Sequence, residues 1–498
     1  MKPNILKHFP VTLFVAILFF AHPVLAVERP VTDHPNIIYI LTDDLGYGDV
    51  HALNPERGKI PTPHMDRLAE QGMVFTDAHT SSSVCTPTRY GILTGRYNWR
   101  TRLQSRVLRG FDRPLIDADR LTVAGMLQQQ GYTTACIGKW HLGLGLPTTT
   151  GKSPAGNNGK DVDWAGRITG GPVDLGFDYY YGISASLDMP PYIYIENDRF
   201  IGAATATKAF NRKGPAHPDF EAVDVLPEIG RKTVEFIKQQ RADKPFFAYV
   251  PFTSPHTPIL PSKEWQGRSE FGKYGDFVMQ TDAVVGQIVA ALDAAGLGKN
   301  TIVIVTSDNG CSRKQAKAEE LQEMGHYPSA QFRGYKSDLW DGGHRVPFIV
   351  RWPARVDGGS TSDQLICLND LRPPVLNCPA QRFLKMQAKT VSVSPLHLRG
   401  TRSNRLARES FTTRFTEIFL IVRANGNCCL VRGRADGRKE KRLRELPASF
   451  MTWTPIRARR PTFTRPSPMS SPRYWLSWNL MSHVVAAPLE PIKRMTFP

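Results

Sequence analysis

A cysteine and an arginine stand at the start of a predicted helix, in the segment Cys85-Thr86-Pro87-Thr88-Arg89. Proline is favoured in the first turn of a helix, so Pro87 indicates that a helix begins near Cys85. At such a terminus the free backbone N–H groups and the positive end of the helix dipole favour a bound anion. The segment therefore predicts a nucleophile, Cys85, beside an anion site that also contains Arg89.

Acidic and amide side chains follow two predicted buried strands. Asp43 and Asp44 come after the apolar run 36–41, and Asp308 and Asn309 come after the apolar run 301–305. A single aspartate at a strand end is more often a turn or helix cap. Two such pairs at matching strand ends favour a binding site, because ligands gather beyond the carboxyl ends of parallel strands. Carboxylate and amide oxygens suit Ca²⁺, with Mg²⁺ as the alternative, and do not suit structural Zn²⁺.

Basic side chains follow two further predicted strands. Lys139 and His141 are two residues apart, so an extended segment places them on one side. His256 lies in Ser254-Pro255-His256-Thr257-Pro258, where the prolines restrict its backbone. Lys336 lies shortly before the segment Gly342-Gly343-His344-Arg345. Each of these residues alone is more often structural or solvent-exposed, so their assignment depends on the rest of the set.

The elements that must position these residues alternate between apolar strands and amphipathic helices. Met65, Leu68 and Ala69 share one helical face, and apolar residues from Phe277 to Leu292 trace another. The predicted strands and helices alternate along residues 36–305. This pattern predicts an α/β fold with a mostly parallel central sheet and helices on both faces.

Six ordered segments resemble the type I sulfatase family, which belongs to the alkaline-phosphatase-like superfamily. They cover residues of about 35–370 and read L-T-D-D-L-G-Y-G-D, C-T-P-T-R with L-T-G-R after it, G-K-W-H-L-G, S-P-H-T-P, S-D-N-G and G-Y-K-S-D-L-W-D-G-G-H-R-V-P. The resemblance implies hydrolysis of sulfate monoesters through formylglycine, an aldehyde that a maturation enzyme makes from Cys85. It implies a sulfated small molecule or carbohydrate as substrate, and the loops 143–176 and 311–332 would choose among such substrates.

The resemblance also implies a role for each matching residue. The divalent cation would be held by Asp43, Asp44, Asp308, Asn309 and the modified side chain at position 85. Arg89 would stabilise the aldehyde hydrate, and Lys139 and Lys336 would bind sulfate oxygens. His256 would act as the acid that protonates the departing alcohol, and His141 as the base. Ser186, in Gly182-Ile183-Ser184-Ala185-Ser186, resembles the family's hydroxyl contact to the nucleophile.

The N-terminus reads as an export signal over residues 1–26. Lys2 and Lys7 precede an almost wholly apolar run at 11–20, and Val24-Leu25-Ala26 supplies small residues for cleavage. We expect an exported protein, periplasmic or secreted, that starts near Val27 and has no membrane span, because no later segment reads as long enough. An uncleaved N-terminal anchor is the alternative. The 7 cysteines are scattered and contain no C-x-x-C pair, so they predict no disulfide framework.

The basic excess of the chain is confined to its last part. Residues 1–370 contain 39 Lys+Arg and 39 Asp+Glu, whereas residues 371–498 contain 24 and 6. The net charge of +18 is therefore no sign of a nucleic-acid partner for the catalytic domain, which we place at 27–371. Residues 372–498 are rich in Arg and Pro and keep no regular apolar period. We expect a disordered, non-native tail there, such as a shifted reading frame would produce, in place of the family's C-terminal subdomain.

Two other functions remain open from the sequence. A phosphatase or phosphodiesterase of the same superfamily would use Ser or Thr with two transition metals, and Cys85 argues against it. A non-enzyme is the other class: an inactive sulfatase-like protein, or a protein that binds polyanions through its basic tail.

Overall fold

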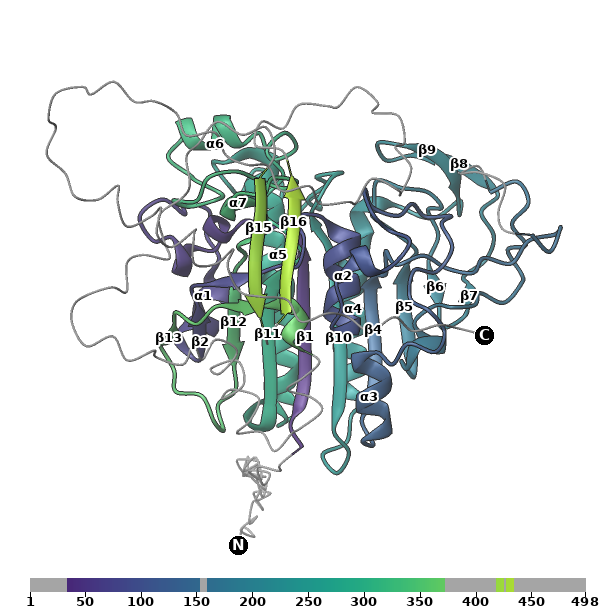
Figure 1. The fold of residues 1–498 in the computed structure, drawn as a ribbon, viewed down its shortest axis with the longest axis horizontal. Coiled ribbons are helices and arrows are strands. Elements are labelled where there is room, and N and C mark those ends of the chain that lie inside the picture. Colours follow the sequence, from purple (N-terminus) through teal and green to yellow (C-terminus); the bar gives the residue numbers. More distant parts are fainter. Residues whose placement is uncertain (1–33, 153–158, 372–417, 425–426, 434–498) are drawn as a thin grey trace, which may run out of the picture. The chain divides into compact units, whose positions relative to one another are not determined.

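A mixed sheet of ten strands forms the centre of the fold, in the order β13-β2-β12-β11-β1-β10-β4-β5-β6-β7 (Figure 1). The computed structural model describes residues 34–152, 159–371, 418–424 and 427–433. The five central strands β11, β1, β10, β4 and β5 are mutually parallel. They span β11 (Thr301–Ser307), β1 (Asn36–Asp43), β10 (Phe246–Pro255), β4 (Thr133–Lys139) and β5 (Tyr179–Ile183).

Both edges of this sheet contain antiparallel pairs. On one side β12 pairs antiparallel with β11 and with β2, and on the other β6 pairs antiparallel with β5 and with β7. The predicted fold class is confirmed, with a parallel centre inside a mixed sheet. The edge strands are β2 (Met73–Phe75), β6 (Ile195–Glu196), β7 (Arg199–Phe200), β12 (Phe348–Arg351) and β13 (Ser360–Ser362).

Helices cover both faces of the sheet because its central strands are apolar on both sides. In β1, Ile38 and Ile40 belong to the core that includes residues of α1, α4 and α5, whereas Ile37, Tyr39 and Leu41 belong to the core that includes α2 and α3. In Figure 1, α2 and α3 lie in front of the central strands. The helices are α1 (Pro63–Glu70), α2 (Cys85–Thr94), α3 (Val123–Gln129), α4 (Val225–Lys238), α5 (Gly272–Ala294), α6 (Ala318–Glu323) and α7 (Asp341–His344).

Short elements complete the part of the chain that the structure describes. Two further two-stranded sheets lie within residues 78–367, formed by β3 (Ala78–His79) with β14 (Ile366–Cys367) and by β8 (Ala206–Ala209) with β9 (Lys213–Ala216). The 3-10 helices are Tyr47–Asp49, His51–Leu53, Asn98–Arg100, Val173–Leu175, Ala222–Asp224, Gly298–Asn300 and Leu368–Leu371.

The helix α5 is long and apolar enough, by length and composition, to cross a membrane. The expectation that no segment after the N-terminus has this length was wrong. In the fold α5 packs against α4, α1 and β10, and its buried residues include Phe277, Val285 and Leu292. It is therefore a core helix of the α/β fold, whose apolar length covers one face of the sheet.

The expected tail contains two described strands, β15 (Ile418–Ala424) and β16 (Asn427–Gly433), which pair antiparallel. The expectation of a disordered, non-native tail over residues 372–498 stays a prediction. The sequences of β15 and β16 are rich in β-branched and other apolar residues, and the dipeptide Asn425-Gly426 between them is typical of tight hairpin turns. The other residues of this tail, and the expected signal peptide 1–26, lie outside the described residues.

A histidine pair joins β3 to α7 near the start of α2. The Nδ1 atoms of His79 and His344 lie 2.9 Å apart, and His344 Nε2 donates to the Leu339 carbonyl over 3.0 Å. His79 Nε2 lies 3.0 Å from an Asp77 carboxylate oxygen. Burial and the facing ring of His79 lower the pKa of His344 to about 4.

We predict that the substitution Gly138→Ala lowers the free energy of unfolding by at least about 2 kcal/mol. Gly138 has a φ of +136°, and an added Cβ would lie 2.0 Å from the Pro251 carbonyl oxygen of the neighbouring strand β10. Urea denaturation measures the change. Gly125→Ala is the control, because the nearest atom to its added Cβ would be 3.4 Å away, an ordinary van der Waals distance. This substitution also replaces a glycine within α3, where alanine is the better helix former. Equal stability of Gly138→Ala and the unsubstituted chain would refute the clash.

The pKa of His344 predicts a pH-dependent stability. Its folded pKa of about 4 lies below the usual value of about 6.5, so between these limits the unfolded chain binds the extra proton and the folded chain does not. The free energy of unfolding therefore rises with pH in this window, by up to about 1.4 kcal/mol per unit. Denaturation at several pH values should show a shallower rise for His344→Gln than for the control His51→Gln; equal slopes would contradict the assignment.

Candidate active site

The register of the central strands brings the predicted site residues to one edge of the sheet. Thr42 of β1 pairs with Ser307 of β11, and Asp43 pairs with Pro255 of β10. Asp308 and His256, each the next residue along its own strand, therefore flank the end of β1 on its two sides. Lys139 is the last residue of β4, on the far side of β10. Four parallel strands thus deliver polar groups beyond their carboxyl ends, as the sequence predicted.

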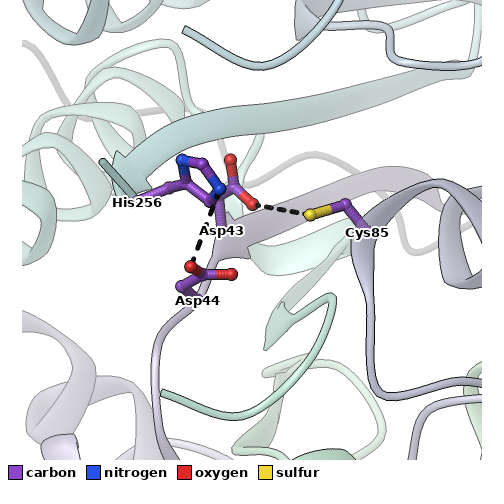
Figure 2. A group of neighbouring side chains, drawn as sticks. All are labelled: Asp43, Asp44, Cys85 and His256. Atoms are coloured by element: carbon purple, nitrogen blue, oxygen red, sulfur yellow. Dashed lines mark hydrogen bonds and ion pairs between the residues drawn. The ribbon is translucent and has the colours of Figure 1, made fainter. Parts of the chain in front are cut away.

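Cys85 is the first residue of α2 and faces the end of β1. Its Sγ lies 3.6 Å from an Asp43 carboxylate oxygen (Figure 2). It also lies 3.5 Å from Lys336 Nζ, and the side chain is buried. The preceding residue Val84 is extended, so the helix begins at the cysteine itself. The free N–H groups of the first turn of α2 consequently lie around position 85.

Arg89 lies one turn further along α2 and is also fully buried. Its Nε and Nη2 donate to one Asp308 carboxylate oxygen over 3.0 and 2.7 Å, and Nη2 lies 3.6 Å from Asp43 Oδ1. A buried guanidinium requires such acidic partners, because an unpaired charge in the interior is costly. Arg89 therefore ties α2 to the ends of β1 and β11.

Two lysines neutralise the other two carboxylates of the site. Lys139 Nζ lies 2.5 Å from Asp43 Oδ2, and Lys336 Nζ lies 2.5 Å from Asp44 Oδ1. Lys139 also lies 3.3 Å from Ser186 Oγ. Lys336 comes from the segment between α6 and α7, so a residue far along the chain pairs with the aspartate that follows β1. Three carboxylates thus meet three cationic side chains.

The two histidines have separate sets of hydrogen-bond partners. His256 Nε2 lies 3.7 Å from Asp44 Oδ2, and its Nδ1 lies 3.3 Å from Ser186 Oγ and 2.6 Å from the Thr257 carbonyl oxygen (Figure 2). His141 Nε2 donates to the Leu108 carbonyl over 2.8 Å. His141 Nδ1 is buried and has no hydrogen-bond partner among the described residues, so it can accept a proton from a group bound in the site.

The pKa shifts follow from this burial and pairing. Burial opposes the charge of Asp43, but Lys139 and the other nearby cations hold its pKa well below the usual range. Burial raises the pKa of the Cys85 thiol to about 12, against the opposing effect of the two lysines. Burial and then Lys139 lower the pKa of His141 well below its usual value. At neutral pH Cys85 is therefore a neutral thiol and His141 a neutral imidazole.

The oxygen-rich set fits a divalent cation. Ligand atoms of Asp43, Asp44, Cys85 and His256 all lie within 4.8 Å of one another. Asn309 Nδ2 donates to Asp44 Oδ1 over 2.7 Å, whereas its carbonyl oxygen Oδ1 is buried without a partner in the described part of the chain. A buried orphan oxygen beside two carboxylates is the arrangement that a hard cation satisfies.

The expected cation ligand Asp308 already has partners for both of its carboxylate oxygens. Asp308 turns one carboxylate oxygen to Arg89 and accepts from the Asp44 backbone N–H with the other over 3.3 Å. A ring nitrogen of His256, which the resemblance implies as the acid, also lies within this cluster of possible ligand atoms. The predicted site residues other than His141 lie in one network of side-chain contacts, including Ser186. The His141 side chain bonds the Leu108 carbonyl instead.

The sequence did not predict the buried residues whose hydrogen bonds support the loop after Asp44. Asp49 accepts from the Gly46 N–H over 2.7 Å, from the Tyr274 hydroxyl over 2.6 Å, and lies 2.9 Å from His326 Nε2. These buried contacts position the loop after Asp44. Asp49 stands in the segment L-T-D-D-L-G-Y-G-D, but its partners lie 225 and 277 residues away and carry no signal in the sequence.

Comparison with known proteins identifies the family of this chain. The family model described as Sulfatase matches residues 35–378. The N-acetylgalactosamine-6-O-sulfatase of Bacteroides thetaiotaomicron is 35% identical over 364 residues, which are 65% of this chain and 68% of that protein. Human arylsulfatase A is 31% identical over 395 residues, which are 76% of this chain and 70% of that protein.

Solved structures agree with this result. A sulfatase structure from Bacteroides thetaiotaomicron, described for the metabolism of multiple glycosaminoglycans, has a TM-score of 0.62 and 30% identity, and the match covers 81% of this chain and 87% of that one. A Pseudoalteromonas sulfatase has a TM-score of 0.54 and 25% identity, with 70% and 68% covered. With the site geometry, these matches lead to one conclusion: the chain belongs to the sulfatase family and is an enzyme of the class that hydrolyses sulfate esters.

Proposed function

We propose that this enzyme is an exported sulfatase that removes sulfate from a sulfated carbohydrate, using formylglycine made from Cys85 and a bound divalent cation, Ca²⁺ or Mg²⁺. The observation that carries the proposal is the position of Cys85. Its buried Sγ lies at the N-terminus of α2, within 3.6 Å of both Asp43 and Lys336. An attacking group at this position would meet acidic, cationic and helix-terminal groups together.

The chemistry of position 85 favours the modified side chain. Burial raises the pKa of the thiol to about 12, so the unmodified cysteine stays protonated and is a weak nucleophile. When formed, formylglycine supplies a hydrated aldehyde with two hydroxyl groups, one for attack on sulfur and one for release of sulfate. His141 Nδ1, buried and without a partner in the described residues, would take the proton from a hydroxyl at this position.

The charges of the site fit a sulfate ester. Three carboxylates, of Asp43, Asp44 and Asp308, balance the three cations of Lys139, Lys336 and Arg89. The cluster alone is therefore close to neutral. Asp43, Asp44 and Asn309 would hold the divalent cation, which would supply two positive charges to offset the negative charges of the anionic substrate and the released sulfate. The lysines provide N–H donors to the sulfate oxygens.

The acid of the reaction is His256 in this proposal. Its Nε2 lies 3.7 Å from Asp44, and Ser186 and the Thr257 carbonyl fix its Nδ1 side. The contact to Thr257 orients the ring, which leaves Nε2 toward the site. A protonated Nε2 would give its proton to the departing alcohol of the ester.

A sulfated carbohydrate is the proposed substrate class. The Bacteroides thetaiotaomicron relative, 35% identical, is named for N-acetylgalactosamine 6-sulfate. Steryl and aryl sulfates are named for human relatives that are 28% and 31% identical. Export of the chain is supported by the basic and apolar pattern of residues 1–26. The maturation enzyme would act on the Cys85 segment.

A first test examines the nucleophile. We expect the tryptic peptide that contains Cys85, from protein made in a host with the maturation system, to show the mass of formylglycine. The same protein should hydrolyse N-acetylgalactosamine 6-sulfate. Cys85→Ala should lose activity by a factor on the order of 10³ or more, because it removes the attacking group. Cys136→Ala, which changes a buried cysteine within β4, should keep it. Turnover by protein that contains only unmodified Cys85 would sink the mechanism.

A second test examines the cation without relying on activity. Ca²⁺ should raise the melting temperature of the chelator-treated protein. At a Ca²⁺ concentration a hundredfold above Kd, the free energy of unfolding should increase by about 3 kcal/mol. Asn309→Ala should reduce this shift, because it removes the orphan oxygen. Asn369→Ala is the matched control, since Asn369 is also a buried amide without a partner in the described chain. The same shift in both variants would exclude Asn309 as a ligand, and Mg²⁺ in a parallel titration identifies the preferred ion.

A further inference from the structure

The segment between α2 and α3 is strongly basic. Residues 96–113 contain six arginines and a single acidic residue, Asp112. The catalytic domain as a whole has no such excess, because residues 1–370 contain equal numbers of basic and acidic side chains. This local charge is therefore a feature of one loop. The six are Arg96, Arg100, Arg102, Arg106, Arg109 and Arg113.

Backbone hydrogen bonds hold this loop against the active site. The Leu108 N–H donates to Thr86 Oγ1 over 3.2 Å, and the Leu108 carbonyl accepts from His141 Nε2 over 2.8 Å. Thr86 directly follows Cys85. The Leu144 N–H also donates to the Asp112 carbonyl over 3.0 Å, which fixes the loop to the segment after His141. The loop is thus part of the wall around the nucleophile and the base.

Two arginines flank this anchor point. Arg106 and Arg109 are two residues before and one residue after Leu108, so their Cα atoms lie within about 8 Å of its Cα. Both are exposed, and within the described chain neither guanidinium has a hydrogen bond or an ion pair. Arg102, by contrast, donates to the carbonyls of Arg113 and Pro114. Arg106 and Arg109 are therefore cations beside the site that are available to a ligand.

The backbone of Arg106 is strained in the same way as the catalytic segments. Its φ is +71°, in the left-handed region that non-glycine residues rarely adopt. Asp44 and His141 have φ values of +67° and +57°, and Ser337, next to Lys336, has +75°. Such strain persists where surrounding contacts enforce it, and it gathers at functional sites. Arg106 shares this feature with three segments that supply site residues, and also with Asn197, Asn211, Lys317 and Ala330 elsewhere in the described chain.

We propose that Arg106 and Arg109 form a subsite for a second anionic group of the substrate, a carboxylate or a further sulfate near the ester that is cleaved. This inference rests on the proposed function and adds to it a substrate that carries at least two anionic groups. Guanidinium groups bind carboxylate and sulfate oxygens through paired N–H donors. A substrate with one anionic group would leave the pair unused, so the two arginines would select polyanionic sugars.

Binding to the full-length chain tests the subsite independently of turnover. Isothermal titration compares three probes: N-acetylgalactosamine 6-sulfate, its 4,6-disulfate, and a chondroitin 6-sulfate disaccharide, which carries a uronate. Arg106→Gln with Arg109→Gln should weaken at least one two-anion probe by about tenfold and leave the monosulfate unchanged. The disaccharide and the disulfate separate a carboxylate from a sulfate as the second anion.

Matched variants separate a loss of binding at the subsite from a general loss of folding. Arg106→Lys with Arg109→Lys should restore most of the affinity, and Arg241→Gln, before the opposite end of β10, should change none. In the matured enzyme, the double substitution to glutamine should raise KM for the two-anion probe whose binding it weakens. It should leave kcat for that probe unchanged. Equal weakening of all three probes, or of none, would overturn the subsite. Retained binding without hydrolysis by the unsubstituted protein that carries formylglycine at position 85 would instead refute the proposed function.

Discussion

Pairing of buried charges is the constraint on which the site depends. Asp43, Asp44 and Asp308 are almost completely removed from water, and each carboxylate has a lysine or arginine partner. Removing one partner would leave an uncompensated charge in the interior, which typically costs about 3 to 5 kcal/mol. The partners come from α2, from β4 and from the segment before α7, so the pairing also fixes these elements against the end of β1.

The parallel centre of the sheet makes this convergence geometrically simple. Adjacent parallel strands end at the same edge, so polar residues placed just after β1, β4, β10 and β11 must lie close together. The backbone then aims individual side chains. Asp44 and His141 adopt left-handed conformations, and the contacts of Asp49 hold the turn that follows Asp44. Strain at these positions is sustained by a tightly packed surrounding, as the close approach of Gly138 to Pro251 illustrates.

These two levels explain what could be predicted from sequence. Strand ends and the start of α2 follow from local patterns, so the amino-acid sequence alone was enough to place Asp43, Cys85, Lys139 and Asp308 at one edge of the sheet. The pairings themselves could not be predicted, because partners such as Lys336 and Asp44 are 292 residues apart and any lysine can fill such a role. The hairpin of β15 and β16 was missed for another reason: the Arg- and Pro-rich composition of the whole tail outweighed its local strand pattern.

Neutrality of the paired cluster has a consequence for how the site forms. Three acids and three bases satisfy one another in the folded chain, so folding requires neither the cation nor the anionic substrate to offset buried charge. Binding then changes the electrostatics in a defined order. In the proposed function, a divalent cation held by Asp43, Asp44 and the orphan oxygen of Asn309 would compete with the lysines for the same carboxylates. The ammonium groups would then be free to bind sulfate oxygens, so affinity for the anion would depend on occupancy by the cation rather than on the net charge of the domain.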